Sequence, residues 1–235
     1  MKVLITSGGC DEPVDGVRFI SNFSSGRTGA GICRYFLESG HQAVFIRNSR
    51  SALVTGEDQN LREYTFRSFS DLQEILYRIA ETENDFDAVI FAAAVSDFSV
   101  DYIKSGDRRI IPGSVPKIDS DSGNEGDLAI VLKKNPKLIS SMKKLFRNAV
   151  LAGFKLTNKA GTTEREEAVM KLFAVSNADF VVSNDLTEIN ETMHKFTIYT
   201  RNGDSPEIAE KGGTKAEMAA KLERLVKILY DRERV

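Results

Sequence analysis

The stretch Thr6–Gly31, TSGGCDEPVDGVRFISNFSSGRTGAG, follows a short apolar run and decides how the rest of the chain is interpreted. That run, Lys2–Thr6 (KVLIT), is apolar and β-branched and stops at Ser7-Gly8-Gly9, which is typical of a buried parallel strand. A long polar segment containing a proline then precedes the next helix, which begins near Gly26. In an open α/β sheet, ligands bind at the carboxyl ends of the strands, so we expect a binding site here.

The composition is that of a soluble globular protein that acts on small molecules. Its 235 residues are 41% hydrophobic and 28% charged, with a formal net charge of −2, so no nucleic-acid partner is expected. The longest apolar run, Ala88–Val95, is far shorter than the ~20 residues of a membrane span, and the amino terminus has no signal-peptide pattern. We therefore expect a cytoplasmic protein with no membrane partner, whose two cysteines, Cys10 and Cys33, are free thiols.

Strand and helix patterns alternate along the chain. After the first strand, a helix runs from Gly26 to Ser39-Gly40, and Ser24 or Ser25 is placed to be its N-cap. Further strands are predicted at Gln42–Ile46, Glu63–Phe66, Asp87–Ala94, Ala149–Phe154 and Asp179–Val182, and further helices at Ser70–Ala80 (capped by Ser70), Pro136–Leu145, Thr163–Val175 and Lys215–Tyr230. This order predicts a single three-layer α/β/α, Rossmann-like domain over residues 1–235 with a mostly parallel sheet.

Two segments depart from this alternation. Ser99–Asp127 has no clear period and is rich in Gly, Pro, Ser and acidic residues, so we interpret it as a protruding arm or lid rather than a packed element. Its acidic part, Asp119–Asp127, lacks the ligand spacing of a calcium loop and is interpreted as a solvated tip. Phe196–Tyr199 and the turn Arg201–Asp204 predict a hairpin at about residues 190–208, which together with the arm could pair two subunits.

The opening stretch lacks the two common phosphate-binding fingerprints. The glycine spacing of a dinucleotide motif does not follow the first strand, and the lysine of a Walker loop is missing. Arg47 and Arg50 would suit a 2′-phosphate, which keeps an NADP-dependent reductase open as an alternative. Ser24-Ser25-Gly26 nevertheless offer hydroxyls and unpaired N–H groups at a helix start, where an anion is favoured by about 0.3–1 kcal/mol. A plain capped helix is the competing interpretation.

Taken as one unit, Thr6–Gly26 resembles the signature TSGGTxEPIDxVRxISNxSSG of phosphopantothenate–cysteine ligase, also called phosphopantothenoylcysteine synthetase. Further matches to that family are Ala92–Phe98 (AAAVSDF), Lys117-Ile118, Asn135–Leu138 (NPKL), Gly153-Phe154 and Ser183–Asp185 (SND). The resemblance covers nearly the whole chain. Because the chain begins directly at the first strand, it resembles the stand-alone form rather than the form fused to a flavin-dependent decarboxylase, and no flavin is expected.

The resemblance implies a ligase of coenzyme A biosynthesis. In this family the carboxylate of 4′-phosphopantothenate attacks the α-phosphorus of CTP or ATP, which gives an acyl-nucleotide and pyrophosphate. The amine of L-cysteine then displaces the nucleotide monophosphate. Members use Mg²⁺ and form homodimers in which each arm completes the other subunit's site. Two polyanions meet in such a site, which accounts for a Gly- and Ser-bearing loop, a lysine on a mobile arm and a divalent metal.

The resemblance also implies roles for individual residues. Asn22 would hold the reacting acyl group, Lys117 would reach the triphosphate from the arm, and Asp97 would bind the nucleotide or the metal. Arg18 and Asp185 are expected to contact the phosphorylated substrate. The residues expected to bind the nucleotide are Gly8, Gly9, Ser24, Ser25, Gly26, Ala93, Asp97, Asn135, Pro136, Lys137, Leu138, Phe154 and Lys171.

The chain departs from the family pattern at two places. Cys10 stands where the family has Thr, which removes a hydroxyl donor, and we do not expect a nucleophilic cysteine because no His lies nearby in the sequence. Of two family lysines that precede the ANDV strand, only Lys171 has a near match here, so the choice between CTP and ATP stays open. A catalytically silent nucleotide-binding homologue is a further alternative.

Overall fold

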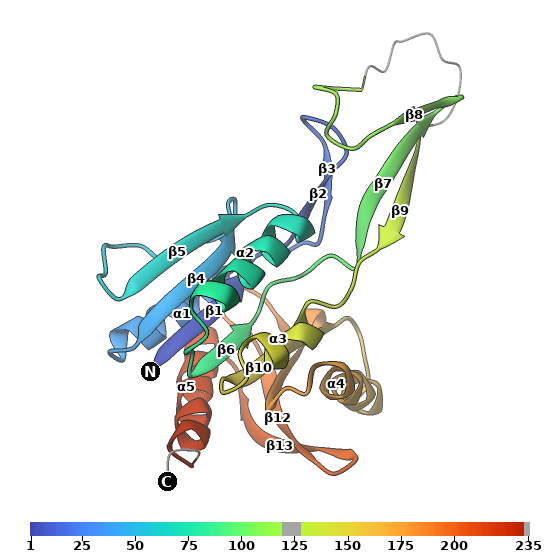
Figure 1. Cartoon of the computed structure of the whole chain (residues 1–235). Coiled ribbons are helices and arrows are strands. Elements are labelled where there is room, and N and C mark those ends of the chain that lie inside the picture. The colour runs from blue at the N-terminus through green and yellow to red at the C-terminus, as the bar shows by residue number, and fades with distance from the viewer. Residues whose placement is uncertain (119–127, 233–235) are drawn as a thin grey trace.

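The central eight-stranded sheet has the order β13-β12-β11-β10-β6-β1-β4-β5 (Figure 1). The computed structural model describes residues 1–118 and 128–232. The strands of this sheet are β1 (Lys2–Ser7), β4 (Gln42–Asn48), β5 (Leu61–Phe66), β6 (Ala88–Phe91), β10 (Val150–Thr157), β11 (Phe180–Asp185), β12 (Phe196–Asn202) and β13 (Ser205–Gly212). The strands from β11 to β5 pair in parallel with one another, whereas β12 pairs antiparallel with β11 and forms the predicted antiparallel hairpin with β13 at one edge. The prediction of a mostly parallel sheet is confirmed.

The strand order reverses between β1 and β6. The chain leaves β1 toward β4 and β5 on one side, and then returns past β1 to β6, β10 and β11 on the other. β6 ends at Phe91 rather than at the predicted Ala94, whose nitrogen instead donates to the carbonyl oxygen of Gly8 at 2.8 Å. The segment that follows β1 therefore lies directly beside the segment that follows β6. In doubly wound sheets, such a reversal point forms a ligand-binding crevice.

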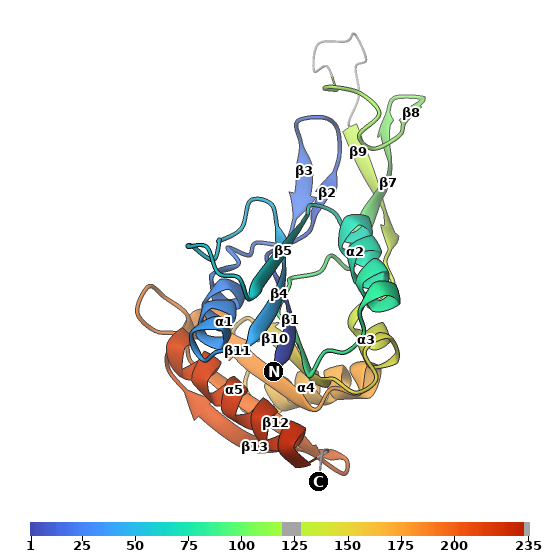
Figure 2. The same cartoon turned by 60° about the vertical axis from the view of Figure 1, so that its left-hand side comes forward.

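Helices cover both faces of the sheet, as predicted for a three-layer domain. α1 (Arg27–Glu38) and α5 (Lys215–Arg232) lie on one face, and α2 (Phe69–Thr82), α3 (Ile139–Leu145) and α4 (Thr162–Ser176) lie on the other (Figure 2). Successive residues of a strand point to opposite faces, so Val3 and Ile5 belong to the core under α1 and α5. Leu4 belongs to the core under α2, α3 and α4.

The helix caps differ from the predictions. The N-cap of α2 is Ser68, whose hydroxyl accepts a hydrogen bond from the nitrogen of Asp71, while the Asp71 carboxylate accepts one from the nitrogen of Ser68. Ser70 lies inside the first turn, so the prediction that it caps the helix is wrong. The N-cap of α1 is Gly26, with φ of 70° and no side-chain cap, and so it is neither Ser24 nor Ser25.

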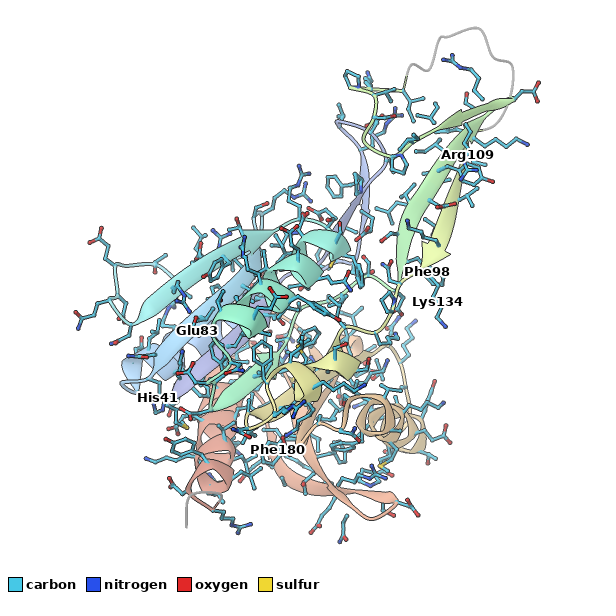
Figure 3. The ribbon with its side chains drawn as sticks, viewed as in Figure 1. His41, Glu83, Phe98, Arg109, Lys134 and Phe180 are labelled. Atoms are coloured by element: carbon cyan, nitrogen blue, oxygen red, sulfur yellow. The ribbon has the colours of Figure 1, made fainter. Side chains whose placement is uncertain are left out.

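The predicted arm is present, but the expectation that it contains no packed element is wrong. β7 (Phe98–Ser105), β8 (Arg108–Ile110) and β9 (Leu128–Lys134) form a three-stranded antiparallel sheet that stands out from the main sheet. Figure 3 labels Phe98 and Lys134, which pair at the base of the arm, and Arg109, which lies toward its far end. Residues 119–127, interpreted from the sequence as an acidic tip, lie outside the described residues.

The opening stretch contains a hairpin that the interpretation as one long loop missed. β2 (Asp11–Pro13) and β3 (Phe19–Ser21) pair antiparallel and lie beside the arm (Figure 2). A small core joins the two and consists of Val14, Val100, Ile103 and Ile118. The nitrogen of Gly16 also donates to the carbonyl oxygen of Val115 at 3.0 Å. The hairpin and the arm are therefore one packed unit.

Candidate functional site

A cleft of about 610 Å³ opens at the carboxyl ends of β1, β6, β10 and β11. Its walls come from Ser7 at the end of β1, from Phe91–Asp97 at the end of β6 and after it, from Phe154–Leu156 in β10 and from Asn184 in β11. The turn Asn22–Gly26 and the first residues of α1 complete it. The cleft therefore occupies the place where this sheet topology positions ligands.

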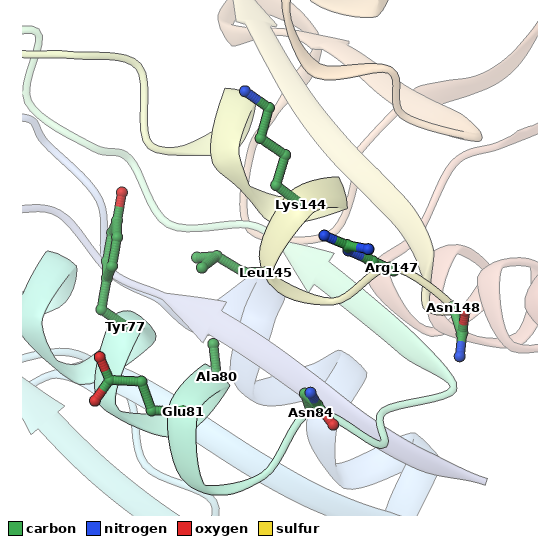
Figure 4. A pocket seen from close by; sticks show the side chains of 8 residues that line it. All are labelled: Tyr77, Ala80, Glu81, Asn84, Lys144, Leu145, Arg147 and Asn148. Carbon is green, nitrogen blue, oxygen red and sulfur yellow. The ribbon is translucent and has the colours of Figure 1, made fainter.

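A second hollow, of about 520 Å³, lies between α2 and the turn that links α3 to β10 (Figure 4). Tyr77 contributes from α2 and Lys144 from α3. Asn84 and Asn148 also line it, and they precede β6 and β10, so the hollow sits at the amino ends of these strands. Its lining contains none of the site residues predicted from the sequence. We therefore assign the candidate site to the cleft at the carboxyl ends.

The two glycines after β1 allow segments of this chain to pass close to one another. A Cβ atom on Gly9 would lie 2.3 Å from the carbonyl oxygen of Asn22. Gly8 has φ of +86°, and a Cβ atom there would lie 2.8 Å from the Cβ atom of Asn48 and 2.9 Å from that of Ser51. Gly8 and Gly9, which were expected to bind the nucleotide, thus pack against the turn that carries Asn22 and the segment that follows β4, and neither lines the cleft.

Asn22 lines the cleft and is exposed to solvent. Its Nδ2 atom donates to the carbonyl oxygens of Ala94 at 3.4 Å and Val95 at 3.2 Å. Only the amine end of the amide can face two carbonyl groups, so these contacts fix the orientation of the side chain. The next residue, Phe23, also lines the cleft with 97% of its surface exposed, and sequence reasoning did not single it out.

The amino end of α1 faces the cleft, as predicted. Ser24, Ser25 and Gly26 line it, together with Arg27 and Thr28. The hydroxyl of Ser7 donates to the carbonyl oxygen of Gly26 at 2.9 Å and anchors this turn to β1. N–H groups in the first turn of a helix have no partner within the helix, and Arg27 adds a positive charge beside them. This side of the cleft is therefore suited to an anion.

The opposite wall is formed by the segments that flank the arm. Ala93, Asp97, Pro136, Lys137 and Leu138 all line the cleft, as expected from the sequence. The ammonium group of Lys137 lies 2.5 Å from the carboxylate of Asp97, and both side chains are exposed. These two residues thus place one positive and one negative charge at the mouth of the cleft.

Asn135 is turned away from the cleft and holds the base of the arm. Its side chain is buried, and its Nδ2 atom donates to the carbonyl oxygen of Ser96 at 3.1 Å and to the hydroxyl of Ser99 at 2.8 Å. The Ser99 hydroxyl is also within 3.0 Å of the amide oxygen of Asn135. The side chain therefore fastens the two strands of the arm where they leave the main sheet.

The far end of the cleft carries polar groups that sequence reasoning missed. Phe154, which was expected, lines it together with Lys155 of the same strand. Asn184 and His194 lie across from them, with Asn184 Nδ2 3.0 Å from His194 Nε2. Asn184 belongs to the SND match but was given no role in the sequence analysis. Lys155 directly follows Phe154, which was the residue expected at the site. His194 was not recognised because it comes from a loop with no periodic pattern before β12.

Besides Gly8, Gly9 and Asn135, four more residues with predicted roles lie away from the cleft, as far as the described residues define it. Lys117 is exposed on the arm, beside the buried Ile118, and Lys171 is exposed on α4. Arg18 bonds to the Asp15 carboxylate at 2.6 Å and to the Ile118 carbonyl oxygen at 2.7 Å, so it joins the hairpin to the arm. The fourth residue is Asp185, considered next.

Asp185 is completely buried and organises two loops. Its carboxylate accepts hydrogen bonds from the hydroxyls of Thr187 at 2.6 Å and Thr157 at 2.7 Å, and from the nitrogens of Lys159 and Ala160. These bonds, above all the one from Thr187, hold the pKa of the Asp185 carboxyl well below its usual range. Its neighbour Asn184 is the residue of this motif that reaches the cleft.

Cys10 and Cys33 are both free, as predicted, and the structure shows that both are buried. Burial raises the pKa of each thiol to about 12, so neither is a nucleophile at neutral pH.

Within residues 1–118 and 128–232, no group of three or more His, Cys, Asp or Glu side chains is arranged to hold a metal ion. Over these same ranges, none of the helices combines the length and the apolar character needed to cross a bilayer.

Comparison with known proteins gives consistent matches. The family model described as "DNA/pantothenate metabolism flavoprotein C-terminal domain" matches residues 1–229. The coenzyme A biosynthesis bifunctional protein CoaBC of Methanocaldococcus jannaschii is 26% identical over 230 residues, which are 97% of this chain and 51% of that protein. The chain thus spans about half the length of this curated relative.

Solved structures share the fold. The DNA/pantothenate metabolism flavoprotein of Streptococcus pneumoniae aligns with a TM-score of 0.83 and 26% identity, over 97% of this chain and 99% of that chain. A mutant of Cab2 in complex with phosphopantothenate-cysteine aligns with a TM-score of 0.75 and 18% identity, over 100% of this chain and 89% of that chain. At that identity, the second likeness concerns the fold alone.

Proposed function

The chain belongs to the family of the DNA/pantothenate metabolism flavoprotein C-terminal domain, and from that premise we propose that it is a phosphopantothenate–cysteine ligase of coenzyme A biosynthesis. It joins 4′-phosphopantothenate to L-cysteine through an acyl-nucleotide formed from CTP or ATP, and releases pyrophosphate. The observation that carries the proposal is the convergence of Asn22, the amino end of α1 and Ala93–Asp97 on one cleft.

The charges around the cleft support a reaction between two anions. The free N–H groups at the start of α1 and the side chain of Arg27 face it from one side. Lys137 and Lys155 face it from the other sides. A carboxylate that attacks a triphosphate must overcome like-charge repulsion, and fixed positive groups lower that barrier most when they act on charge that develops in the transition state. In this proposal, the α1 end and Lys137 bind the phosphate groups, and Lys155 adds positive charge at the far end of the cleft.

Asn22 is placed to hold the acyl group. Its amine end is fixed by the carbonyl oxygens of Ala94 and Val95, so the side chain presents a constant geometry to a ligand. A neutral amide suits a carbonyl carbon that becomes tetrahedral, because it does not ionise and does not repel either anionic reactant. The proposed role of Asn22 is to keep the acyl-nucleotide oriented for attack by the amine of cysteine.

Asp97 fits a magnesium ion in the manner usual for nucleotide sites. Mg²⁺ is commonly held by one or two carboxylates together with substrate phosphates, and Asp97 is an exposed carboxylate that lines the cleft. When bound, the ion supplies charge neutralisation to the triphosphate. The ammonium group of Lys137, now paired with Asp97, is then available to a phosphate oxygen.

Lys117 can serve a cleft if two subunits associate. It lies on the arm and not on the cleft of its own chain, within the part that the structure describes. The arm exposes alternate apolar residues along β9, with Leu128 44%, Ile130 37% and Leu132 44% exposed. We propose a homodimer in which this apolar stripe is covered and Lys117 reaches the other subunit's site, with the hairpin at about residues 190–208 as a second contact. Sedimentation equilibrium tests it: a dimer is expected, and Leu132→Asp should yield monomers.

Pyrophosphate release tests the ligase activity directly. Release should require both 4′-phosphopantothenate and a nucleotide, and cysteine should then yield the amide product. CTP, ATP, GTP and UTP are compared in the same assay, and NADPH oxidation is followed in parallel to detect a reductase. Asn22→Asp should bind nucleotide and form almost no amide. No pyrophosphate with any nucleotide would contradict the proposal and leave a silent homologue, whereas turnover of NADPH would identify the reductase.

A further inference from the structure

The loop between β11 and β12 places a buried histidine behind the cleft. His194 is 6% exposed, and its main-chain nitrogen donates to the carbonyl oxygen of Gly213 at 2.6 Å. A bridge to Ile189 folds the loop back on itself. The main chain of His194 is therefore held on both sides, and the Nε2 atom of its ring lies 3.0 Å from Asn184 Nδ2. These main-chain contacts position the residue, and its imidazole ring contacts the side-chain amide of Asn184.

The other ring nitrogen of His194 has no hydrogen-bond partner among the residues that the structure describes. Nδ1 is a buried atom without a hydrogen bond, which is rare for a native side chain and costs stability. Burial, reinforced by the positive charge of Lys215, lowers the pKa of His194 to about 4, so the ring is neutral at pH 7. A neutral ring whose Nε2 accepts from Asn184 carries its hydrogen on Nδ1. An apolar residue at position 194 would avoid this cost in stability. The presence of a histidine in contact with Asn184 therefore requires another explanation.

The surroundings of Asn184 are those of a site for a flat, mostly apolar group. Asn184 is opposite Leu156 in the register of β10 and β11, and both line the cleft. Phe154, Leu172 and Leu186 add further apolar surface at this end. Because Nδ2 is turned toward His194, the amide oxygen of Asn184 is the atom left to a ligand. An apolar recess with one oriented acceptor suits the edge of a nucleobase that carries an amino group.

On this geometry, and resting on the function proposed above, we propose that His194 is a positioning residue that orients Asn184 to recognise the exocyclic amino group of the nucleobase. Cytosine and adenine carry that group. Uracil and guanine have a carbonyl oxygen at the corresponding position, which would face the amide oxygen of Asn184. A site built around one hydrogen bond rejects the analogue that cannot make it more strongly than an apolar pocket does.

Calorimetric titration of the full chain with CTP, ATP, UTP and GTP tests this assignment. We expect CTP or ATP to bind about 10-fold or more tightly than UTP and GTP, as expected for one lost hydrogen bond that leaves a polar group unpaired. Asn184→Leu should bring the four affinities to within about 3-fold of one another. His194→Leu should do the same because the amide of Asn184 is no longer held. His194→Gln, whose amide can occupy the place of Nε2, should restore most of the preference.

Thermal unfolding separates positioning from a structural role. His194→Leu removes the unpaired buried nitrogen, so its Tm should equal or exceed that of the unsubstituted chain even as the preference is lost. ¹⁵N NMR of the imidazole should show a neutral ring with the hydrogen on Nδ1 at pH 7. Retained discrimination in Asn184→Leu, or a charged ring at pH 7, would overturn the assignment. Equal loss of preference in His194→Gln and His194→Leu would do so as well.

The outcomes also separate this assignment from the proposed ligase. A chain that binds CTP or ATP selectively through Asn184 but makes no amide leaves the assignment standing and removes the ligase. A chain that makes the amide, and whose Asn184 and His194 variants keep the selectivity of the unsubstituted chain, removes only the assignment. A chain that binds none of the four nucleotides overturns both.

Discussion

The Asp15 carboxylate accepts a hydrogen bond from the main-chain nitrogen of Ile118 at 2.9 Å, across a separation of 103 residues. The same carboxylate oxygen binds the guanidinium group of Arg18 at 2.6 Å. One side chain therefore joins the β2–β3 hairpin to the arm. Since the hairpin also leads into the turn that carries Asn22, the base of the cleft and the arm are mechanically connected.

Removing the Asp15 carboxylate should loosen the arm without unfolding the sheet. In Asp15→Ala, we expect hydrogen exchange at residues 98–118 to become at least several-fold faster, because the arm packs mainly against the hairpin. Asp101→Ala is the matched control, since it removes an arm carboxylate whose partner Arg109 is exposed and 3.4 Å away. Mass-spectrometric exchange measures both. Equal protection in the two variants would show that Asp15 does not secure the arm.

Acid should destabilise the protein in two separate pH ranges. The pKa of His194 is lowered to about 4 by burial, so the unfolded chain takes up a proton near pH 6.5 before the native protein does, and stability falls between about pH 6.5 and 4. The pKa of Asp185 is also lowered, chiefly by Thr187, and its contribution is present above its unfolded pKa, near 4, and lost as pH falls below it.

The two ranges can be assigned with variants. His194→Leu should flatten the dependence of Tm on pH between 6.5 and 4, and Asp185→Asn should flatten it below about pH 4 while lowering Tm at neutral pH. Scanning calorimetry at intervals of pH gives both curves. If each variant keeps the slope of the unsubstituted chain in its own range, the titrating groups have been assigned wrongly.

A methyl group at Gly9 should displace Asn22. The added carbon would lie 2.3 Å from the carbonyl oxygen of Asn22, so Gly9→Ala should cost about 1–3 kcal/mol of stability and reduce turnover by at least ~10-fold. Gly31→Ala is the control, because nothing lies within 4 Å of a Cβ atom there and the position is inside α1. It should leave turnover unchanged and stabilise the protein by about 0.5–1 kcal/mol. Urea unfolding and the pyrophosphate assay report the two effects.

The cap of α2 can be tested at two neighbouring serines. Ser68→Ala removes the hydroxyl that accepts from the nitrogen of Asp71 and should cost about 1 kcal/mol. Ser70→Ala removes a hydroxyl that bonds only to Ser68 among the described residues, and should cost about 0.5 kcal/mol or less. Equilibrium urea unfolding of both variants distinguishes the caps. A larger loss for Ser70→Ala would reverse the assignment.

The central strands of the sheet were predictable because they are buried on both faces. Runs such as Val3–Ile5 and Ala88–Phe91 are apolar at every position, and the helical repeats between them are amphipathic. The strands of the arm could not be predicted from an alternation of apolar and polar residues. In Leu128–Lys134, every side chain is exposed or half-exposed, so burial imposes no such alternation. The strands of the opening hairpin, β2 and β3, are too short to show an alternation of apolar and polar residues. The cap at Ser68 did carry a signal, because Asp71 follows it at the spacing of a capping box.

The cleft residues that lie at the ends of neighbouring strands could be predicted from the sequence. The residue that comes from a distant loop could not. Ser24–Gly26, Ala93, Asp97 and Phe154 reach the cleft because the carboxyl ends of neighbouring parallel strands share one edge. His194 enters from a loop that is not itself patterned, and its burial depends on Gly213 and Ile189, which no local sequence rule connects. Asn135 matched a motif, yet its side chain fastens the arm and does not line the cleft.

The position of β6 between β1 and β10 determines when the cleft can exist during synthesis. Its lining runs from Ser7 to His194, and parallel strands pair only after their crossovers have been made. A ribosome that has released only the signature loop and α1 has therefore produced one wall of the cleft, without the lining residues that come from the ends of β6, β10 and β11. If nucleotide binds in this cleft as proposed, it can stabilise the domain fully only after the loop that carries His194 has emerged.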